Sequence, residues 1–379
     1  MLNKKKILFL TGTRADFGKL KSLMKKVEDS DLFELYIFVT GMHMMSKYGL
    51  TSIEVESSGF SNVYKYINQN LNDSMDVVLA KTVLGLGDYV KELNPDLIVV
   101  HGDRVEAMAG AIVGSLNNIL VGHVEGGEVS GTIDELIRHS VSKMAHIHFV
   151  SNELARKRLL QLGELESSIF IIGSPDLDIM VSKKLPSIEC VLEKYQIPFN
   201  DYAVLMYHPV TTELDGLKAE ISAVVDAVIE SNKNYVVVYP NNDHGTDVIL
   251  NEYKRLDGNQ RVRIFPSIRF EYFLVLLKFC KFMIGNSSAG VREAPFYGLP
   301  SINIGSRQNN RSTSESVINA SGDSRVIFNA IKQVENMSCK PYREFGEGNS
   351  DQLFIDVLGS PSLWCISQQK LFNDFEVRE

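Results

Sequence analysis

The sequence predicts an α/β protein made of two Rossmann-like domains, each built on a parallel sheet. Three observations lead to this prediction. Short runs rich in β-branched residues recur in both halves of the chain and alternate with segments long enough for helices. Most of these runs stop at glycine or at polar residues, as strands do at a ligand-binding edge. A chain of 379 residues, 44% of them hydrophobic, can also bury two cores.

Six runs in the first half are predicted to be the strands of a doubly wound parallel sheet. They span residues 6–10, 34–43, 96–103, 118–128, 147–152 and 168–178. A second series of five runs follows, over residues 202–209, 235–243, 262–267, 281–288 and 300–307. The chain therefore resembles two similar strand-helix halves in succession.

The domain limits are predicted from the positions of two prolines and from the spacing of apolar residues near the C-terminus. Pro175 and Pro186 mark the way out of the first half, so we expect one domain over residues 1–175 and a second over 176–360. Residues 361–379 are expected to form a C-terminal helix that returns to the first domain. The apolar side chains of this amphipathic helix would point inward: Leu363, Trp364, Leu371, Phe372 and Phe375.

Composition excludes several classes of protein. The net charge of −8 argues against a nucleic-acid binder. The four cysteines are scattered without a C-x-x-C pair, which favours reduced thiols in a cytoplasmic protein and no zinc site. The basic and apolar start is too short for a signal peptide, because Arg14 and Asp16 follow it at once. No segment is long and apolar enough to span a membrane.

Titratable residues are concentrated between His101 and His139. Asp103 and Glu125 each follow a predicted buried strand, so both side chains should lie at one edge of the sheet. Thr132 then looks like the N-cap of a helix in which Asp134 and Arg138, four residues apart, share one face. The stretch therefore predicts a functional site.

Simpler interpretations exist for each member of this stretch. Asp134 and Arg138 could form an ordinary surface ion pair, and Glu135 completes a T-x-x-E capping box with Thr132. Carboxylates at strand ends also cap the helices that follow them. A functional site is nevertheless favoured because further ionisable residues fall in the same segment: His101, Arg104, His123 and His139.

The first predicted strand leads into T-G-T-R-A-D-F-G, a glycine-bearing turn that opens a helix. Such a turn can bind an anion at the helix N-terminus, and Arg14 would add charge-assisted hydrogen bonds. The pattern is neither G-x-G-x-x-G nor a P-loop. A plain strand-to-helix turn with an exposed Arg14 is the alternative.

The second half has its own polar cluster, in residues 285–311. Ser287 and Ser288 lie at a predicted turn between a strand and a helix opened by Gly290, where hydroxyls and helix amides can bind a pyrophosphate. Arg307 and Arg311 would balance the phosphate charge. These residues predict a nucleotide site.

Glu293 falls in the first turn of that predicted helix. A carboxylate there can accept two hydrogen bonds from ribose hydroxyls. It can also simply complement the helix dipole, a contribution of up to about 1 kcal/mol. The neighbouring serines and arginines favour nucleotide binding.

Many motifs, in order along almost the whole chain, resemble one family. They are GTRADFGK, TGMHM, HGDR, HVEGGEVSGTID, IRH, GSPDLD, HPVTTE, YPNND, SIRFEYF, GNSSAGVREA and GSRQNNR. The family is that of the hydrolysing UDP-N-acetylglucosamine 2-epimerases of sialic acid biosynthesis, in its stand-alone bacterial form. The resemblance implies a GT-B fold, with two Rossmann-like domains facing each other across a cleft and the nucleotide held by the C-terminal one.

The resemblance also implies a reaction and residue roles. UDP-GlcNAc and water would give N-acetylmannosamine and UDP, by anti elimination of UDP to a glycal and then hydration. Asp103, Glu125 and Asp134 would be the acid/base carboxylates, and His208 would assist the departing phosphate or relay a proton. Arg14, Arg104 and Arg138 would hold phosphate or orient carboxylates. One departure is Glu135, where many members carry a second Asp; its place in the capping box makes this tolerable.

We accordingly expect a UDP-sugar substrate, no cofactor, no metal, no nucleic-acid or membrane partner, and a homodimer or homotetramer. A GT-B glycosyltransferase, a non-hydrolysing epimerase and a non-catalytic nucleotide-sugar sensor are the alternatives. Non-hydrolysing members resemble H-x-E-A-G where this chain has HVEGGE. The sugar also stays open, because relatives act on UDP-2,4-diacetamido-trideoxyglucose or GDP-linked GlcNAc in legionaminic acid routes.

Overall fold

The computed structural model describes residues 4–130, 133–241, 243–312 and 314–374. The chain divides into two compact units. The N-terminal unit comprises Met1–Glu128, Asp134–Val181 and Phe345–Glu379, and the second unit comprises Val129–Ile133 and Ser182–Glu344. The chain therefore leaves the N-terminal unit after Val181 and returns to it at Phe345, whereas the sequence suggested limits at 175 and 360.

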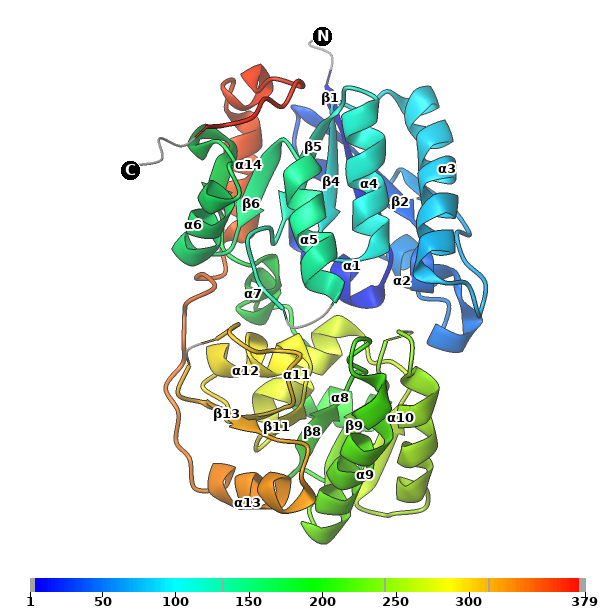
Figure 1. Ribbon diagram of the computed structural model, residues 1–379, viewed down its shortest axis with the longest axis vertical. Helices are drawn as coiled ribbons and strands as arrows, with labels where there is room; N and C mark the ends of the chain where they lie inside the picture. The colour runs from blue at the N-terminus through cyan, green and yellow to red at the C-terminus, as the bar shows by residue number, and fades with distance from the viewer. Residues whose placement is uncertain (1–3, 131–132, 242, 313, 375–379) are drawn as a thin grey trace. The chain divides into compact units, whose positions relative to one another are not determined.

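The N-terminal unit contains a parallel sheet with the strand order β3-β2-β1-β4-β5-β6-β7 (Figure 1). Its strands are β1 (Lys5–Thr11), β2 (Phe33–Val39), β3 (Val63–Lys65), β4 (Leu97–His101), β5 (Leu120–Val124), β6 (Ile147–Val150) and β7 (Ile169–Ile171). The order reverses between β1 and β4. Such a switch point is where doubly wound sheets bind ligands.

Helices cover both faces of this sheet. They are α1 (Arg14–Glu28), α2 (Ser52–Ser57), α3 (Met75–Leu93), α4 (Val105–Leu116), α5 (Ile133–Met144), α6 (Glu153–Gln161), α7 (Pro175–Met180) and α14 (Ser350–Gly359). Figure 1 shows α4 and α5 in front of the central strands, with α3 beside α4. On α14, Phe354 packs against Phe9 and Phe149 with ring centroids 6.0 and 4.7 Å apart, so a segment from the far end of the chain completes the core.

The second unit repeats the plan with the strand order β10-β9-β8-β11-β12-β13, and its switch point lies between β8 and β11. The strands are β8 (Ala203–Met206), β9 (Tyr235–Val238), β10 (Val262–Phe265), β11 (Met283–Gly285), β12 (Ser301–Ile304) and β13 (Val317–Ala320). The helices are α8 (Ile188–Lys194), α9 (Leu214–Glu230), α10 (Thr246–Tyr253), α11 (Phe270–Phe279), α12 (Glu293–Phe296) and α13 (Ser324–Val334). The predicted α/β class with two parallel sheets is confirmed.

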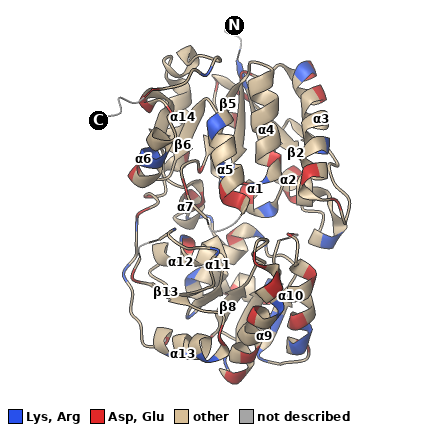
Figure 2. Cartoon of the chain, in the orientation of Figure 1, with Lys and Arg blue, Asp and Glu red and all other residues tan. Residues whose placement is uncertain are grey.

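Short 3-10 turns complete the secondary structure: η1 (Gly41–Met44), η2 (Ser46–Tyr48), η3 (Glu166–Ser168), η4 (Lys254–Leu256), η5 (Ser288–Gly290) and η6 (Leu363–Cys365). Figure 2 shows basic and acidic segments interspersed along the helices, for example on α3, α9 and α10. Within the described parts of the chain, no helix has both the length and the apolarity needed to cross a membrane.

The C-terminal segment is not the predicted amphipathic helix. The last helix ends at Gly359, and beyond it the described residues form η6 and then irregular structure. Leu363 is buried and Trp364 packs against the core, but Leu371 and Phe372 are 78% and 82% exposed. Phe375 lies outside the described residues. The helix prediction is therefore wrong. Apolar packing fixes Leu363 and Trp364, whereas polar contacts fix the later stretch around Lys370.

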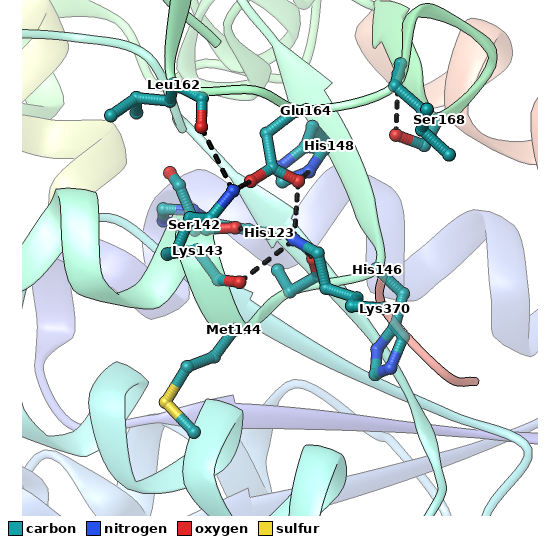
Figure 3. A network of polar contacts seen from close by, with 12 residues as sticks. His123, Ser142, Lys143, Met144, His146, His148, Leu162, Glu164, Ser168 and Lys370 are labelled. Atoms are coloured by element: carbon teal, nitrogen blue, oxygen red, sulfur yellow. Dashed lines mark hydrogen bonds and ion pairs between the residues drawn. The ribbon is translucent and has the colours of Figure 1, made fainter. Parts of the chain in front are cut away.

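Lys370 provides those contacts (Figure 3). Its ammonium donates hydrogen bonds to the backbone carbonyls of Lys143 and Ala145, at 2.9 and 2.6 Å, where α5 ends, and it also pairs with Glu164. The Glu164 carboxylate lies 3.0 Å from Nε2 of the buried His148. Burial by itself would raise the pKa of Glu164, but His148 and Lys370 lower that pKa to about 2. A buried ionic network thus holds the end of the chain to the N-terminal unit.

Candidate active site

The two strand-end acids that the sequence singles out come from neighbouring strands. Asp103 follows β4 and Glu125 follows β5, and these strands pair in parallel. Gly102 and Glu125 both have left-handed backbone conformations, with φ of 69° and 66°. Glycine adopts this conformation readily, whereas a glutamate there is uncommon and must be held by its surroundings. The sharp turn at Glu125 is consistent with a functional position.

The Glu125 carboxylate is only 4% exposed and is surrounded by donors. Its Oε1 atom lies 3.3 Å from His101 Nε2, 3.4 Å from Lys19 Nζ and 3.4 Å from Ser174 Oγ. Lys19 also lies 3.7 Å from Asp176 Oδ2. A buried carboxylate needs such partners, since desolvation otherwise disfavours its charge.

Arg138 is the cation at the centre of the acidic cluster. It comes from α5, is 2% exposed and forms an ion pair with Asp103. Burial lowers the pKa of Arg138, but nearby carboxylates outweigh this effect and raise the pKa above its usual value. These carboxylates are Asp103, Glu128, Glu125 and Asp134. The alternative of a surface Asp134–Arg138 ion pair is therefore wrong, because Arg138 is buried among acids from three segments.

His123 supports the turn that carries Asp103. It is fully buried, which lowers the pKa of its imidazole to about 3 and keeps it neutral. Its Nε2 lies 2.8 Å from the backbone oxygen of Gly102, so this nitrogen donates, and Nδ1 accepts from the Ser142 hydroxyl at 3.0 Å. His123 thus connects β5 to α5 and to the end of β4 through hydrogen bonds, which is a structural role.

Two other members of the predicted cluster have local partners. His139 Nε2 lies 3.4 Å from the Glu135 carboxylate one turn earlier on α5, and both side chains are about one-third exposed. Thr132, the proposed N-cap partner of Glu135, lies outside the described residues. Glu128 accepts a hydrogen bond of 2.9 Å from Ser151.

The backbone N–H groups of the glycine turn after β1 find their hydrogen-bond partner within the turn itself. Thr13 and Asp16 form a capping box, and the Asp16 carboxylate accepts hydrogen bonds from the backbone N–H groups of Gly12 and Thr13, both at 3.0 Å. Arg14 Nε lies 2.8 Å from Glu54. The two amides that the sequence offers to an anion are therefore already bonded to Asp16.

Arg104 directly precedes α4, beyond the end of β4. It is the N-cap residue of α4, and its Nε is 3.4 Å from the Glu106 carboxylate. Glu106 is buried, and a Cβ atom on Gly12 would lie 3.0 Å from its carboxyl carbon. A larger residue at position 12 would therefore press against this acid, and the Glu106 side chain would have to shift.

In the second unit, His208 and Asn286 follow β8 and β11, on either side of the switch point. The Asn286 amide accepts from the His208 backbone N–H at 2.6 Å and donates to the His208 carbonyl at 2.8 Å. His208 Nδ1 accepts the backbone N–H of Asn241 at 3.1 Å, so the ring proton of a neutral His208 must be on Nε2. His208 can therefore act as a hydrogen-bond or proton donor.

The turn after β11 approaches the backbone of β8 very closely. Gly285 has φ of 133°, and a Cβ atom there would lie 1.9 Å from the Met206 carbonyl oxygen, so only glycine fits. Ser287 caps η5, and its hydroxyl accepts from the Ala289 N–H at 3.4 Å. The helix predicted to open at Gly290 is wrong: Ser288 and Gly290 belong to the 3-10 turn η5, and the single-turn helix α12 follows.

The remaining predicted residues lie around this turn. Arg307 donates to the Asn286 carbonyl at 3.3 Å, Gln308 donates to the same oxygen at 2.9 Å, and Arg311 donates to the Gln308 side chain at 2.9 Å. Glu293 begins α12 and is buried. The structure thus gathers Ser287, Arg307 and Arg311 around Asn286.

The sequence did not predict that Lys19, Ser174 and Asp176 belong to the site. It also did not predict that Asn286 holds the backbone of His208. Lys19 lies inside the GTRADFGK motif and Ser174 and Asp176 inside GSPDLD, so the motifs contained a signal that strand-end logic alone did not use. In the described part of the chain, no group of three or more His, Cys, Asp or Glu side chains is arranged to hold a metal ion.

Comparison with known proteins decides the family. Residues 25–359 match the profile described as UDP-N-acetylglucosamine 2-epimerase. The chain belongs to the UDP-N-acetylglucosamine 2-epimerase family. This confirms the resemblance drawn from the motifs.

Three relatives match nearly the whole chain. The UDP-N-acetylglucosamine 2-epimerase of Neisseria meningitidis serogroup B is 47% identical, over 98% of this chain and 100% of its own. The UDP-N,N'-diacetylbacillosamine 2-epimerase (hydrolyzing) of Legionella pneumophila is 34% identical, over 93% and 95%. Polysialic acid biosynthesis protein P7 of Escherichia coli is 32% identical, over 97% and 92%.

Solved structures of the epimerase family share the GT-B fold. The UDP-GlcNAc 2-epimerase of Methanocaldococcus jannaschii, crystallised in complex with UDP-GlcNAc and UDP, superposes with a TM-score of 0.80. It is 22% identical and covers 93% of this chain and 99% of its own. The predicted GT-B class is therefore confirmed.

Proposed function

We propose that this chain is a hydrolysing UDP-GlcNAc 2-epimerase that converts UDP-GlcNAc and water into N-acetylmannosamine and UDP. The observation that carries the proposal is the buried acid cluster of the N-terminal unit. Glu125 contacts Lys19 and His101, while Asp103 is paired with Arg138. Clustered and mutually dependent ionisable groups of this kind suit proton transfer.

The reaction needs two proton transfers at one carbon. In the elimination, a base takes the C2 proton, the C1–O bond breaks, and UDP leaves with the bonding electrons to give a glycal. In the hydration, water adds its oxygen to C1 and a proton reaches C2 from the opposite face. Because a C2 hydrogen beside an acetamido group is weakly acidic, C1–O cleavage must run ahead and generate positive charge that carboxylates stabilise.

The three carboxylates are proposed to share these steps. Glu125 is held by Lys19 and His101, whose donors favour its charged form. Asp103 is fixed by Arg138, and Asp134 lies in the first turn of α5 within the electrostatic influence of the same guanidinium. The cluster thus offers acids in distinct surroundings, as a reaction that needs both a base and an acid requires.

The leaving group is assigned to the second unit. His208 has its ring proton on Nε2, so it can donate to a phosphate oxygen as UDP departs. Ser287, Ser288, Gly290, Arg307 and Arg311 are proposed to bind the pyrophosphate and Glu293 the ribose hydroxyls. Arg14 and Arg104 of the N-terminal unit are proposed to hold phosphate or orient carboxylates. The Methanocaldococcus family member with UDP bound supports a uridine nucleotide as ligand.

The hydrolysing course is favoured by the relatives that state their course. The Legionella protein at 34% identity and a Campylobacter jejuni protein at 32% identity are both named hydrolyzing. The name of the Neisseria protein at 47% identity states no course. The polysialic acid biosynthesis protein supports a place in sialic acid biosynthesis. A cytoplasmic location is proposed from the scattered, unpaired cysteines of the sequence.

A second donor is supported by the same Legionella relative, whose name gives UDP-N,N'-diacetylbacillosamine. The 47% identity to the Neisseria enzyme favours UDP-GlcNAc. Turnover on UDP-GlcNAc, UDP-N,N'-diacetylbacillosamine and GDP-GlcNAc, compared at equal concentration, decides between them.

Incubation with UDP-GlcNAc and no acceptor tests the reaction itself. We expect free UDP and free N-acetylmannosamine in equal amounts. Formation of UDP-ManNAc would instead identify a non-hydrolysing epimerase. UDP release that depends on an added acceptor would identify a glycosyltransferase, and binding without turnover a sensor.

A further inference from the structure

The chain leaves and re-enters the N-terminal unit through two segments that touch. The outgoing segment runs from Gly173 through α7 to Val181, and the returning segment starts at Phe345 and leads into α14. A Cβ atom on Gly346 would lie 2.9 Å from the Gly173 Cα atom, and both glycines have positive φ. The two backbones therefore approach at a distance that only glycine allows.

Hydrogen bonds hold the outgoing and returning segments together at this junction. The backbone N–H of Ser174 donates to the Phe345 carbonyl at 2.7 Å. At the other end of α7, the Asp178 carboxylate accepts the backbone N–H groups of Ser350 and Asp351 at 2.7 and 2.8 Å, and so caps α14. The outgoing helix thus holds the start of the returning one.

Ser174 connects the same junction to the acid cluster. It precedes the Pro175 that begins α7, in the N-cap position, yet its hydroxyl makes no capping bond. The hydroxyl instead donates to Glu125 Oε1 at 3.4 Å, from a side chain that is completely buried. Two residues further along the chain, Asp176 contacts Lys19, which in turn contacts the Glu125 carboxylate.

We propose that Ser174 is a positioning residue that ties Glu125 to the point where the chain returns from the second unit. Its hydroxyl fixes and stabilises the Glu125 carboxylate, and its backbone N–H anchors that contact to Phe345. The proposal deepens the proposed function, on which it rests, because Glu125 matters for turnover only if that function is right. Its consequence is that a disturbance of the junction changes the charge state of Glu125.

The groups that face Glu125 set the expected sign. Lys19 and His101 contact its carboxylate alongside Ser174, and Arg138 acts on it over a longer distance. Loss of one donor leaves the carboxylate less stable in its charged form, so the Glu125 titration midpoint should rise. Because this hydrogen bond is long, we expect a rise of about one pH unit, equivalent to a tenfold change in equilibrium.

The test is a ¹³C NMR titration of protein labelled at the glutamate carboxyl carbon, with the Glu125 resonance assigned by its loss in Glu125→Gln. Ser174→Ala should raise the Glu125 midpoint. The matched control is Ser151→Ala, which removes another buried hydroxyl from the edge of the sheet, one that donates to Glu128. An unchanged Glu125 midpoint in folded Ser174→Ala, or an equal rise in Ser151→Ala, overturns the proposal.

A second pair of variants tests the junction. Gly346→Ala would force the two backbones apart, whereas a Cβ atom on Gly359, at the end of α14, meets nothing within 4 Å. Gly346→Ala should raise the Glu125 midpoint and Gly359→Ala should not. If folded Gly346→Ala keeps the wild-type Glu125 midpoint, the returning segment does not influence Glu125 and that part of the proposal is wrong. If Gly346→Ala does not fold, the Ser174→Ala titration still decides the central claim.

Kinetics separate this proposal from the proposed function. In Ser174→Ala, the limb of the kcat–pH profile that reports Glu125 should move to higher pH, with kcat about tenfold lower at the wild-type optimum and KM little changed. If the wild type does not turn over UDP-GlcNAc, the proposed function fails, while the NMR titration still tests the link between Ser174 and Glu125.

Discussion

Asn286 holds the backbone of His208 by both of its polar groups. It accepts the His208 N–H at 2.6 Å and donates to the His208 carbonyl at 2.8 Å, which joins the ends of β8 and β11. The carbonyl of Asn286 in turn accepts from Arg307 and Gln308. The histidine proposed to assist phosphate departure and the arginine proposed to bind phosphate thus share one asparagine.

The first prediction concerns this asparagine. Asn286→Ala should destabilise the second unit by about 2–3 kcal/mol, because it removes two buried hydrogen bonds and leaves their backbone partners unsatisfied. It should also lower kcat about 10- to 100-fold if His208 acts on the leaving group, since a misplaced donor loses its alignment. Urea unfolding and steady-state kinetics measure the two effects. Wild-type kcat in the folded variant would separate Asn286 from the chemistry.

Glu293 carries a prediction about binding. Glu293→Gln should weaken UDP binding about tenfold and leave kcat nearly unchanged, because ribose contacts are much the same in the ground and transition states. Calorimetry with UDP measures this. The control is Glu335→Gln, which changes an exposed pair with Lys233 in the same unit. Unchanged UDP affinity in Glu293→Gln would assign Glu293 to the structure of α12.

The sequence predicted the two sheets because most strands are buried runs of β-branched residues. It missed β3 and β13, which are edge strands of three and four residues with half-exposed side chains and hence no buried run. It also assigned a helix to the C-terminal segment, because Leu371 and Phe372 fit a helical spacing. Nothing in that spacing shows that Lys370 binds carbonyl oxygens at the end of α5.

The sequence predicted the acids Asp103 and Glu125 but not two of the side chains that contact Glu125. Asp103 and Glu125 directly follow strands, and strand ends meet at one edge of a parallel sheet. Lys19 and Ser174 come from α1 and from the start of α7, and only the packing of these helices, which lie beside each other, brings them to Glu125. Such contacts depend on tertiary structure and leave no periodic pattern in the sequence.

Lys370 gives a prediction about stability. Lys370→Met should lower the free energy of unfolding by about 3 kcal/mol, because it removes the partner of a buried carboxylate and the donor to several carbonyls. Chemical unfolding measures this. Lys26→Met is the matched control, since its ammonium lies 3.7 Å from the partly exposed Asp351 and should contribute little. Equal losses in both variants would show that the Glu164 network does not depend on Lys370.

The buried histidines predict that the protein loses stability in mild acid. Burial lowers the pKa of His123 to about 3 and that of His43 to about 4. A histidine of this kind binds its proton only after unfolding, so stability falls as the pH drops below the unfolded value near 6.5. At pH 5 each of these two histidines should cost about 2 kcal/mol.

Asp178 opposes this trend. Burial raises its pKa to about 6, against the effect of its hydrogen bonds, so its protonation stabilises the folded state as the pH falls from about 6 toward 4. Its contribution at pH 5 is about 1 kcal/mol, so His123, His43 and Asp178 together give a net loss of about 3 kcal/mol between pH 7.5 and pH 5. Burial also lowers the pKa of His146 and that of His148, which adds to the loss. Urea unfolding at both values measures the difference. Equal stability at the two values would contradict the neutral state of the histidines.

The last prediction concerns the C2 proton. Asp103→Asn, Glu125→Gln and Asp134→Asn should each lower kcat by about two to four powers of ten and still bind UDP, because the proposed uridine ligands lie in the second unit. In deuterated water, wild-type enzyme should release N-acetylmannosamine that carries deuterium at C2, since the proton returned to C2 comes from a group that exchanges with solvent. Mass spectrometry of the product measures this label. Near-normal UDP release by both Asp103→Asn and Glu125→Gln would refute the acid/base assignment. A product without deuterium at C2 would exclude an elimination with solvent exchange and leave a shielded single-base route or a different reaction.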